Sequence, residues 1–363
     1  MSLRGLLADC YAQGRYTVKQ IKVILRKKQM GGSMKFYFSL TLVINLANSC
    51  HSQQSFGEGL LKLEQTILLP KVKGRIDHMD VNVKERIVYM AALGNNSLEV
   101  VDIQNGNLLH SIRGLDEPQG VGYIPQHHEI VVANGGNGAC IFYNDKTFEK
   151  TATVQLSSDA DDVRYDSAER KIYVGYGDGA IAVIDADTHQ KTGNIKLPAH
   201  PEGFQLDKAL GRLYVNVPDA GVICVIDLGK QKLIEEWKND GNANFPMAID
   251  AMRHRIFIGY RRPAKFEVLD GKSGQKIASN ETLGDMDDLY FDNFTNEVLA
   301  RGGGGAVHIF RQEPNGYKQV ANIHTRSGAR TSLLIPQFSL FVLAERAAGN
   351  QDATLLVYKI AGR

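Results

Sequence analysis

Residues 171–185 read KIYVGYGDGAIAVID, which is two short apolar runs separated by a Gly-Asp-Gly turn. The same pair of runs recurs along the chain. The first run begins at seven positions that lie 41 to 43 residues apart: Ile87, Ile130, Ile172, Leu213, Ile256, Val298 and Phe341. The second run begins at Leu98, Cys140, Ala182, Cys224, Phe266, Val307 and Leu355. Gly and Asn, which tolerate positive φ, lie between many of these runs, so each pair is predicted to form a β-hairpin.

Each hairpin is flanked by two further runs. In the third copy, Val163 and Tyr165 alternate with polar residues before the first run, and residues 192–197 follow the second. Four strands in a unit of about 42 residues are typical of a β-propeller blade. The seven units therefore predict an all-β, seven-bladed β-propeller with four-stranded antiparallel blades over residues 61–363.

The last unit lacks its fourth strand, because it ends at Ile360 after three. Residues 64–70 (EQTILLP) are similar to residues 191–198 (KTGNIKLP), the fourth strand of the third unit. We therefore expect the N-terminal strand to complete the last blade and close the ring, which hides two strand edges.

The composition excludes several classes of protein. With 363 residues, 43% hydrophobic and 23% charged, the chain is neither disordered nor fibrous, and it is not a polytopic membrane protein. Its four cysteines form no CxxC pair, which excludes a zinc ribbon and a thioredoxin-like site. Cys140 and Cys224 occupy equivalent positions two blades apart, too far for a disulfide, so we predict buried free thiols.

Residues 34–50 have the features of a secretory signal peptide. A short basic start precedes an apolar run, Phe36–Leu46, and small or polar residues lead to Cys50. The sequence before Cys50 resembles the lipobox of bacterial lipoproteins, which implies lipidation of that cysteine; a plain signal peptide is the alternative. Residues 1–33 are interpreted as a basic leader or as a misassigned start before Met34, and residues 51–60 as a tether. We expect export to the periplasm or cell envelope, with the outer membrane as the destination of a lipidated form.

Export changes the charge of the domain. Residues 1–50 hold eight basic residues and one acidic residue, which leaves 34 basic and 39 acidic residues in the rest of the chain. A negative domain does not favour contact with a phosphate backbone. No nucleic-acid partner is expected, and the only predicted membrane contact is a lipid anchor.

The repeats resemble the YVTN-repeat β-propeller family, specifically secreted bacterial YncE-like proteins. The resemblance lies in the I/L-Y-V and V-I-D strands and in the segments where blades begin, such as residues 74–78, 117–120, 159–166 and 200–207. It covers residues 60–360. It implies the fold and export, and it implies no activity, because a fold does not define a function.

Inner strands of a propeller run side by side around one channel, so equivalent positions form rings. The residues just before the apolar alternation of each inner strand are mostly polar, which predicts a ligand site at one mouth of the channel. The candidate ligand-binding residues are Asp77, His78, Gln119, Asp161, Asp162, His200, Glu202, Asn244, Asp287, Asp288, Arg330 and Thr331. We expect this mouth to be acidic, with Arg330 as its single opposite charge. We expect Arg261 to lie in a solvated loop, with a small anion contact as the alternative.

Three interpretations of the acidic mouth stay open. The mouth can hold Ca²⁺ or Mg²⁺, which prefer oxygen ligands; the candidate metal ligands are Asp162, Asp288, His78 and Glu202. The carboxylates can form a small-ligand site in which crowding raises carboxyl pKa values. Alternatively, they only bond to neighbouring backbone groups.

Two functions follow from these interpretations. The first is an exported, non-catalytic binding module for a small ligand or a protein partner. The alternative is a divalent-metal-dependent hydrolase of the lactonase or esterase type that uses the same carboxylates. No GxSxG, HExxH or P-loop motif occurs, and gluconolactonase-type propellers have six blades where we count seven. We expect a monomer, with no cofactor other than Ca²⁺ or Mg²⁺.

Overall fold

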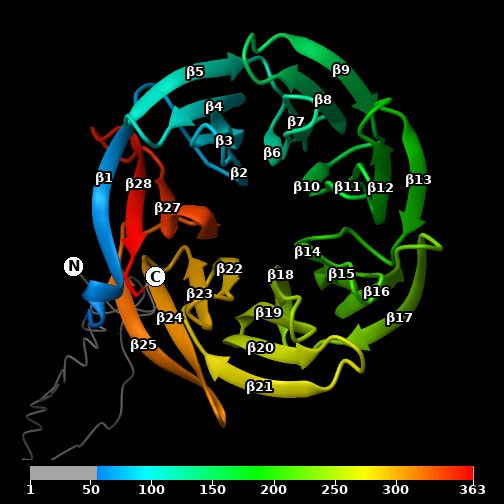
Figure 1. Ribbon diagram of the computed structural model, residues 1–363, viewed down its shortest axis with the longest axis vertical. Coiled ribbons are helices and arrows are strands. Elements are labelled where there is room, and N and C mark those ends of the chain that lie inside the picture. Colours follow the sequence, from blue (N-terminus) through cyan, green and yellow to red (C-terminus); the bar gives the residue numbers. More distant parts are fainter. Residues whose placement is uncertain (1–54, 363) are drawn as a thin grey trace, which may run out of the picture. The chain divides into compact units, whose positions relative to one another are not determined.

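The computed structural model describes residues 55–362, and Figure 1 shows their strands as a ring of sheets around a central axis. There are seven sheets, and each has four strands in antiparallel order. The prediction of a seven-bladed β-propeller with four-stranded antiparallel blades is therefore confirmed.

Blades 1 to 6 each use four consecutive strands, ordered from the channel outward. Blade 1 contains β2 (Met79–Asn82), β3 (Ile87–Ala92), β4 (Ser97–Asp102) and β5 (Asn107–Arg113). Blade 2 contains β6 (Pro118–Ile124), β7 (Glu129–Asn134), β8 (Ala139–Asn144) and β9 (Lys150–Gln155). Blade 3 contains β10 (Ala160–Asp166), β11 (Lys171–Tyr176), β12 (Ala180–Asp185) and β13 (Lys191–Lys196).

Blade 4 contains β14 (Phe204–Asp207), β15 (Arg212–Val217), β16 (Val222–Asp227) and β17 (Lys232–Lys238). Blade 5 contains β18 (Asn242–Asp250), β19 (Arg255–Arg262), β20 (Ala264–Asp270) and β21 (Lys276–Glu281). Blade 6 contains β22 (Met286–Asp292), β23 (Glu297–Gly302), β24 (Ala306–Glu313) and β25 (Gly316–His324). Blade 7 contains β26 (Ser332–Ile335), β27 (Leu340–Glu345), β28 (Ala353–Ile360) and β1 (Leu61–Leu69). Four short 3₁₀ turns complete the described elements: η1 (Glu58–Leu60), η2 (Leu93–Asn95), η3 (Pro218–Ala220) and η4 (Pro336–Phe338).

The second strand of a blade is buried along almost its whole length. Every residue of β3, β7, β23 and β27 is buried. Neighbouring blades cover both faces of these strands, which is why they read as continuous apolar runs rather than as alternating ones. The outermost strands, such as β5, are mostly exposed. The core is therefore a series of apolar layers between blades, one of which joins Ile67, Val88 and Val342.

The N-terminal strand closes the ring. Strand β1 pairs with β28 in antiparallel register from Leu61 opposite Ile360 to Leu69 opposite Ala353, so the expected closure is confirmed. Residues 56–60, which we expected to belong to a tether, also contact the propeller: the Phe56 N–H donates to the Asn322 carbonyl at 3.1 Å. This second contact joins the N-terminal segment to blade 6.

Cys140 and Cys224 are free and buried, as predicted. Burial raises the pKa of both thiols to about 12, which makes them unreactive. The predicted signal peptide, the lipidation site Cys50 and the basic leader lie outside the described residues. Within residues 55–362, no helix has the length and apolar character needed to cross a membrane.

Candidate binding site at the channel mouth

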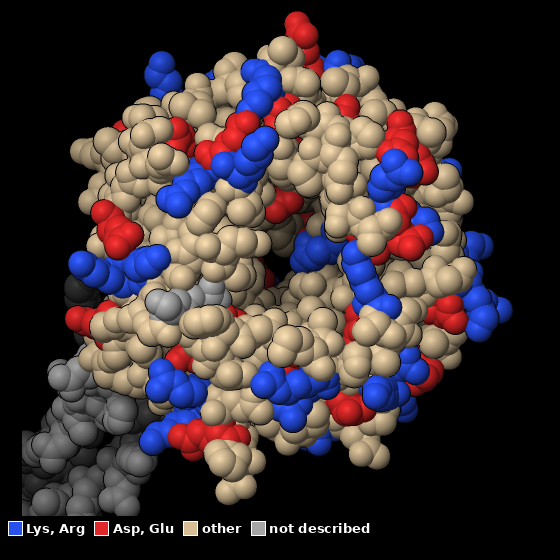
Figure 2. Space-filling model, viewed as in Figure 1, with Lys and Arg blue, Asp and Glu red and all other residues tan. Residues whose placement is uncertain are grey.

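The inner strands surround a cavity of about 1120 Å³ along the axis of the ring. Figure 2 shows that this hollow opens at the centre of the face in view and that both basic and acidic side chains line its wall. Residues before β2, such as Arg75, line one end, and Lys84, which follows β2, lines the cavity farther along. The end that is lined by residues before the inner strands is called the mouth below.

In blades 2, 3, 5 and 6, bulges interrupt the inner strand at the predicted mouth positions. In blade 3 the regular register of β10 with β11 is interrupted between Ala160 and Val163, and the interruption contains Asp161 and Asp162. A bulge turns a side chain away from the regular alternation, so both carboxyl groups lie at the channel. Comparable shifts occur at the same place in blades 2, 5 and 6.

All the predicted site residues except Asn244 line the cavity. These are Asp77, His78, Gln119, Asp161, Asp162, His200, Glu202, Asp287, Asp288, Arg330 and Thr331. Asn244 is fully buried between blades, where its amide donates to Asn216 Oδ1 at 3.1 Å and its own oxygen accepts a bond from Asn239. The placement of Asn244 at the mouth was wrong, because the residue lies before the bulge and points into the interface of blades 4 and 5.

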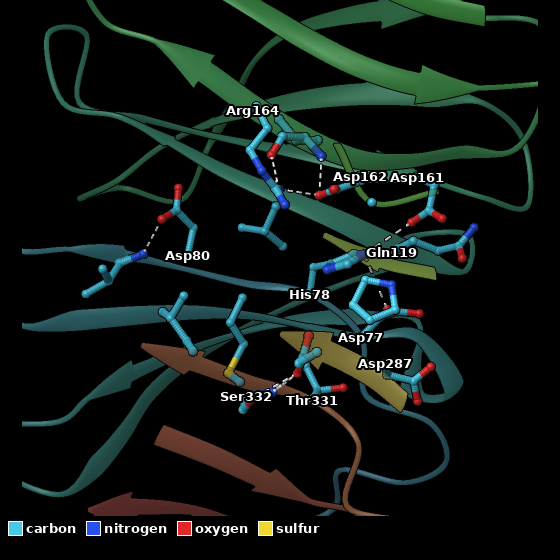
Figure 3. Close-up of a pocket in the computed structure, with 18 of the residues that line it drawn as sticks. Asp77, His78, Asp80, Gln119, Asp161, Asp162, Arg164, Asp287, Thr331 and Ser332 are labelled. Atoms are coloured by element: carbon cyan, nitrogen blue, oxygen red, sulfur yellow. Dashed lines mark hydrogen bonds and ion pairs between the residues drawn. The ribbon is translucent and has the colours of Figure 1, made fainter. Parts of the chain in front are cut away.

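His78 lies at the centre of this group (Figure 3). Its Nε2 is 3.6 Å from Asp161 Oδ1 and 3.8 Å from Asp77 Oδ1. Burial alone would lower the pKa of His78, but the carboxylates of Asp162, Asp161 and Asp77 outweigh burial and raise that pKa well above its ordinary value. The surrounding carboxylates therefore favour the imidazolium form of His78.

The mouth holds more positive charge than the sequence predicts. Arg330 is not the single opposite charge, because Arg75, Arg164 and Arg261 also line the cavity. The prediction of a solvated Arg261 was wrong: its guanidinium lies 4.0 Å from the centre of the Phe245 ring, donates to the Met286 carbonyl and pairs with Asp287. Arg75 and Arg330 lie in loops, Arg164 lies within β10 and Arg261 lies near the end of β19, and only the packing of neighbouring blades brings them together.

The arginines pair with the carboxylates of the mouth, and Arg261 and Arg330 share Asp285 and Asp287. Arg75 Nη2 is 2.7 Å from Asp77 Oδ2, and Arg330 Nη2 is 2.5 Å from Asp285 Oδ2. Arg164 pairs with Asp162. The mouth is thus charge-mixed rather than acidic.

The carboxylates considered as metal ligands have other partners. Asp162 accepts bonds from Arg164 and from the Val163 N–H, and Asp288 Oδ2 accepts bonds from the Ser332 N–H at 2.6 Å and from its hydroxyl at 2.8 Å. Burial raises the pKa of Asp288 to about 7. Across residues 55–362, no group of three or more His, Cys, Asp or Glu side chains is arranged to hold a metal ion.

At the side of the mouth formed by blades 3 and 4, the pKa values of two carboxyl groups shift in opposite directions. Burial, reinforced by the charge of Asp161, raises the pKa of Glu202 to about 8. Burial would also raise the pKa of Asp161, but His200 and His78 outweigh burial and lower it. The same ion pair helps raise the pKa of His200 to about 9, against the effect of burial. Glu202 is therefore largely protonated near neutral pH beside an ionised Asp161.

Polar contacts between successive inner strands, which the sequence analysis missed, hold this geometry. Asp80 Oδ2 accepts the Tyr123 N–H at 2.6 Å, and Gln205 donates to the Met247 carbonyl at 2.9 Å. The Tyr290 hydroxyl donates to the Ser332 carbonyl at 2.6 Å. Each contact joins one blade to the next. In each case the polar side chain that makes the contact lies two or three positions after the last mouth residue of its blade. This spacing can be recognised in the sequence when the seven inner strands are aligned with one another.

The raised pKa values make the stability of the ring depend on pH. A carboxyl whose pKa rises on folding holds its proton more tightly in the folded state, so for Glu202 stability is lost as pH rises from 4.5 toward 8. The stability that His200 contributes is complete below its ordinary pKa of 6.5 and is lost as pH rises through about 9. The lowered pKa of Asp161 acts in the opposite sense, below its ordinary value of 3.8. We expect Tm to fall between about pH 6 and pH 9.

Circular dichroism melting curves across this pH range measure the effect. In Glu202→Gln the side chain stays neutral, so we expect a smaller fall of Tm with pH than in the unchanged chain. Asp352→Asn, at an exposed position that does not line the cavity, is the matched control and should show the same fall of Tm with pH as the unchanged chain. If the Tm of Glu202→Gln falls with pH as steeply as that of the unchanged chain, the assignment of a protonated Glu202 is contradicted.

Comparison with known proteins supports the fold and nothing finer. No protein-family model matches the sequence. No curated protein matches it either. By contrast, 1785 chains of solved structures are similar in structure. One of these belongs to a structure titled "Crystal Structure of Mitotic Checkpoint Complex"; it covers 93% of this chain and 99% of its own length, with a TM-score of 0.72 and 13% sequence identity. Because identity this low shows only a shared fold, the YncE-like resemblance stays a prediction.

Proposed function

We propose that this chain is an exported, non-catalytic binding module that holds a ligand or a partner at the mouth of its channel. One observation carries the proposal: the cavity is large enough for a small molecule, and charged side chains from several blades converge on it. His78 lies among them, and its Nε2 makes only long ion pairs, 3.6 Å to Asp161 Oδ1 and 3.8 Å to Asp77 Oδ1. A cation that is held in place by such long contacts is suited to receive a ligand.

The hydrolase alternative has no comparable support. It requires several oxygen ligands on one ion, whereas Asp162 and Asp288 already bond to Arg164 and Ser332. β-Propellers commonly act as interaction modules, and the similar chain described above comes from a complex. A protein partner that inserts a side chain or a chain end into the mouth is therefore as compatible with the site as a free small molecule.

A thermal-shift screen of metabolites and dipeptides against the full chain tests the proposal. Compounds that raise Tm are measured again with His78→Asn and Asp161→Asn, and with Asp352→Asn as the control. We expect the two mouth variants to lose the stabilisation and the control to keep it. Compounds that stabilise all the proteins equally would place the binding site elsewhere and contradict the proposal.

Export is a separate part of the proposal and depends on residues 34–50. A lipid on Cys50 would hold the protein at a membrane, whereas cleavage at a plain signal peptide would release it. In bacterial cells we expect the full chain in the membrane fraction and Cys50→Ala in the soluble periplasmic fraction. Cys224→Ala, which changes a buried thiol, is the control and should fractionate like the unchanged chain. Equal membrane retention of Cys50→Ala would contradict lipidation.

A further inference from the structure

The mouth presents its cations to the solvent and keeps most of their carboxylate partners behind them. The side chains of Arg75, Arg330 and His78 are 56%, 37% and 32% exposed. The side chain of Asp285, the partner of Arg330, is itself 39% exposed, but those of Asp77 and Asp161 are only 10% and 11% exposed. A molecule that enters from solvent therefore meets N–H donors before it meets these carboxylates.

The buried carboxylate oxygens cannot themselves be the contact surface. Asp161 Oδ1 and Asp162 Oδ2 have almost no contact with solvent and no hydrogen-bond partner among the described residues, and the equally buried Asp77 Oδ2 faces Arg75 Nη2 at 2.7 Å. Their charges act on the cations in front of them, which they hold in position and keep protonated. They form the support of the site, and a ligand does not need to reach them.

The exposed cations retain unused donors. Arg75 has one ion pair, through Nη2, and Arg330 uses Nη2 and Nε toward Asp285 and Asp287. The ring nitrogens of His78 are 3.6 Å or more from the nearest carboxylates, which is too long for a hydrogen bond. Within the described part of the chain, these three side chains therefore have N–H groups available for a ligand.

The ring closure brings these three side chains to adjacent blades. The hydroxyl of Thr331, the residue after Arg330, donates to the Ile76 carbonyl at 2.8 Å. Ile76 follows Arg75 and lies two residues before His78. Blade 7 and blade 1 are thus joined at the mouth, and Arg330 lies beside the segment that carries Arg75 and His78.

We propose that Arg75, His78 and Arg330 form a binding site for an oxyanion, which is the carboxylate or phosphate group of the ligand. The proposal rests on the binding function proposed above and specifies its ligand. Guanidinium groups match planar carboxylates and phosphates through paired N–H donors, and an adjacent imidazolium adds a third charge-assisted bond. Three of the four nearest carboxylates, Asp77, Asp285 and Asp287, are paired with arginines, and the fourth, Asp161, is buried behind His78, so they oppose an incoming anion less than free carboxylates would.

Calorimetric titration of the full chain at low ionic strength tests this site with succinate and inorganic phosphate as probes. Succinamide is the uncharged match of succinate, and ethylenediamine is the cationic counterpart. We expect at least one oxyanion to bind, and succinamide and ethylenediamine not to bind. A response to succinate alone identifies a carboxylate site, and a response to phosphate alone identifies a phosphate site. Both outcomes support the proposal.

Arg75→Gln and Arg330→Gln should each weaken oxyanion binding at least tenfold, because each removes a charge and its paired donors. Arg113→Gln, at an exposed position on the outer strand of blade 1, should bind like the unchanged chain. Unchanged melting curves confirm that the variants fold. Oxyanion binding that survives in the Arg75→Gln/Arg330→Gln double variant would overturn the proposal, as would preferential binding of ethylenediamine. If neither oxyanion binds, the oxyanion site is also overturned. The proposed binding function would still be supported in that case if the thermal-shift screen finds compounds of another class whose binding requires His78.

Discussion

Replacing Ile67 by alanine is expected to lower the free energy of unfolding by about 2–5 kcal/mol. Ile67 lies in β1 opposite Leu355 of β28 and is 1% exposed. It packs in the apolar layer between blades 7 and 1, with Val88 on the blade 1 side. The lost methyl groups would leave a cavity at the seam of the ring, where a strand from one end of the chain completes a sheet from the other end.

Chemical and thermal unfolding measure this effect, and the same strand supplies the control. Leu68, the next residue, is 62% exposed, so Leu68→Ala should change the free energy of unfolding by no more than about 0.5 kcal/mol. Leu69→Ala, at a fully buried position, should repeat the loss seen for Ile67→Ala. Equal effects of Ile67→Ala and Leu68→Ala would show that β1 does not close the ring in solution.

Arg301→Ala is expected to destabilise the ring by about 3–5 kcal/mol. Arg301 is a fully buried residue of β23 whose guanidinium donates to the carbonyls of Gly302, Ala306 and Ala329. The last of these bonds crosses from blade 6 to blade 7 and fixes the residue before Arg330. Removing the side chain leaves a cavity and deprives buried carbonyls of a donor, and each carbonyl left without another donor costs about 1–3 kcal/mol.

A second variant separates packing from hydrogen bonding. Arg301→Met restores most of the volume but none of the donors, so it should recover only part of the stability lost in Arg301→Ala. Urea unfolding curves of both variants give the comparison, with Arg113→Met as the exposed control. If Arg301→Met is as stable as the unchanged chain, then the bonds between blades 6 and 7 make no net contribution.

The fold is predictable from the sequence because a blade is built from local hairpins. The spacing of runs such as the one at Ile172 counts the blades, and the similarity of residues 64–70 to a fourth strand identifies the closure. The ring positions can also be counted, because residues at the same distance from each inner turn lie at the same level of the channel. The position of Asp161 at the mouth follows from that count alone, whereas blade 1 contributes Asp77 and His78 only after a one-residue shift that brings Met79 and Val81 into apolar register.

The charges of the site are not predictable in this way. Arg75 lies before a strand and Arg261 lies near the end of one, and no regular pattern places either at the channel. Asn244 has the spacing of a mouth residue and nevertheless lies between two blades, because the bulge that exposes the ring residues begins after it. The neighbouring blade decides the orientation of these side chains, and the residue pattern of a single strand does not contain that information.

The sequence by itself determined the number of blades, their strands, the closing of the ring by β1 and the level at which polar residues meet the channel. These features depend on local hydrogen bonding and on periodic burial, and the residue pattern of each repeat encodes both. Only the tertiary structure decided which charges pair and which segments meet, since Arg330 pairs with Asp285 and the neighbouring Thr331 bonds to Ile76 before blade 1. Electrostatic interactions depend on distances between residues far apart in the chain, and these distances exist only after the ring has closed.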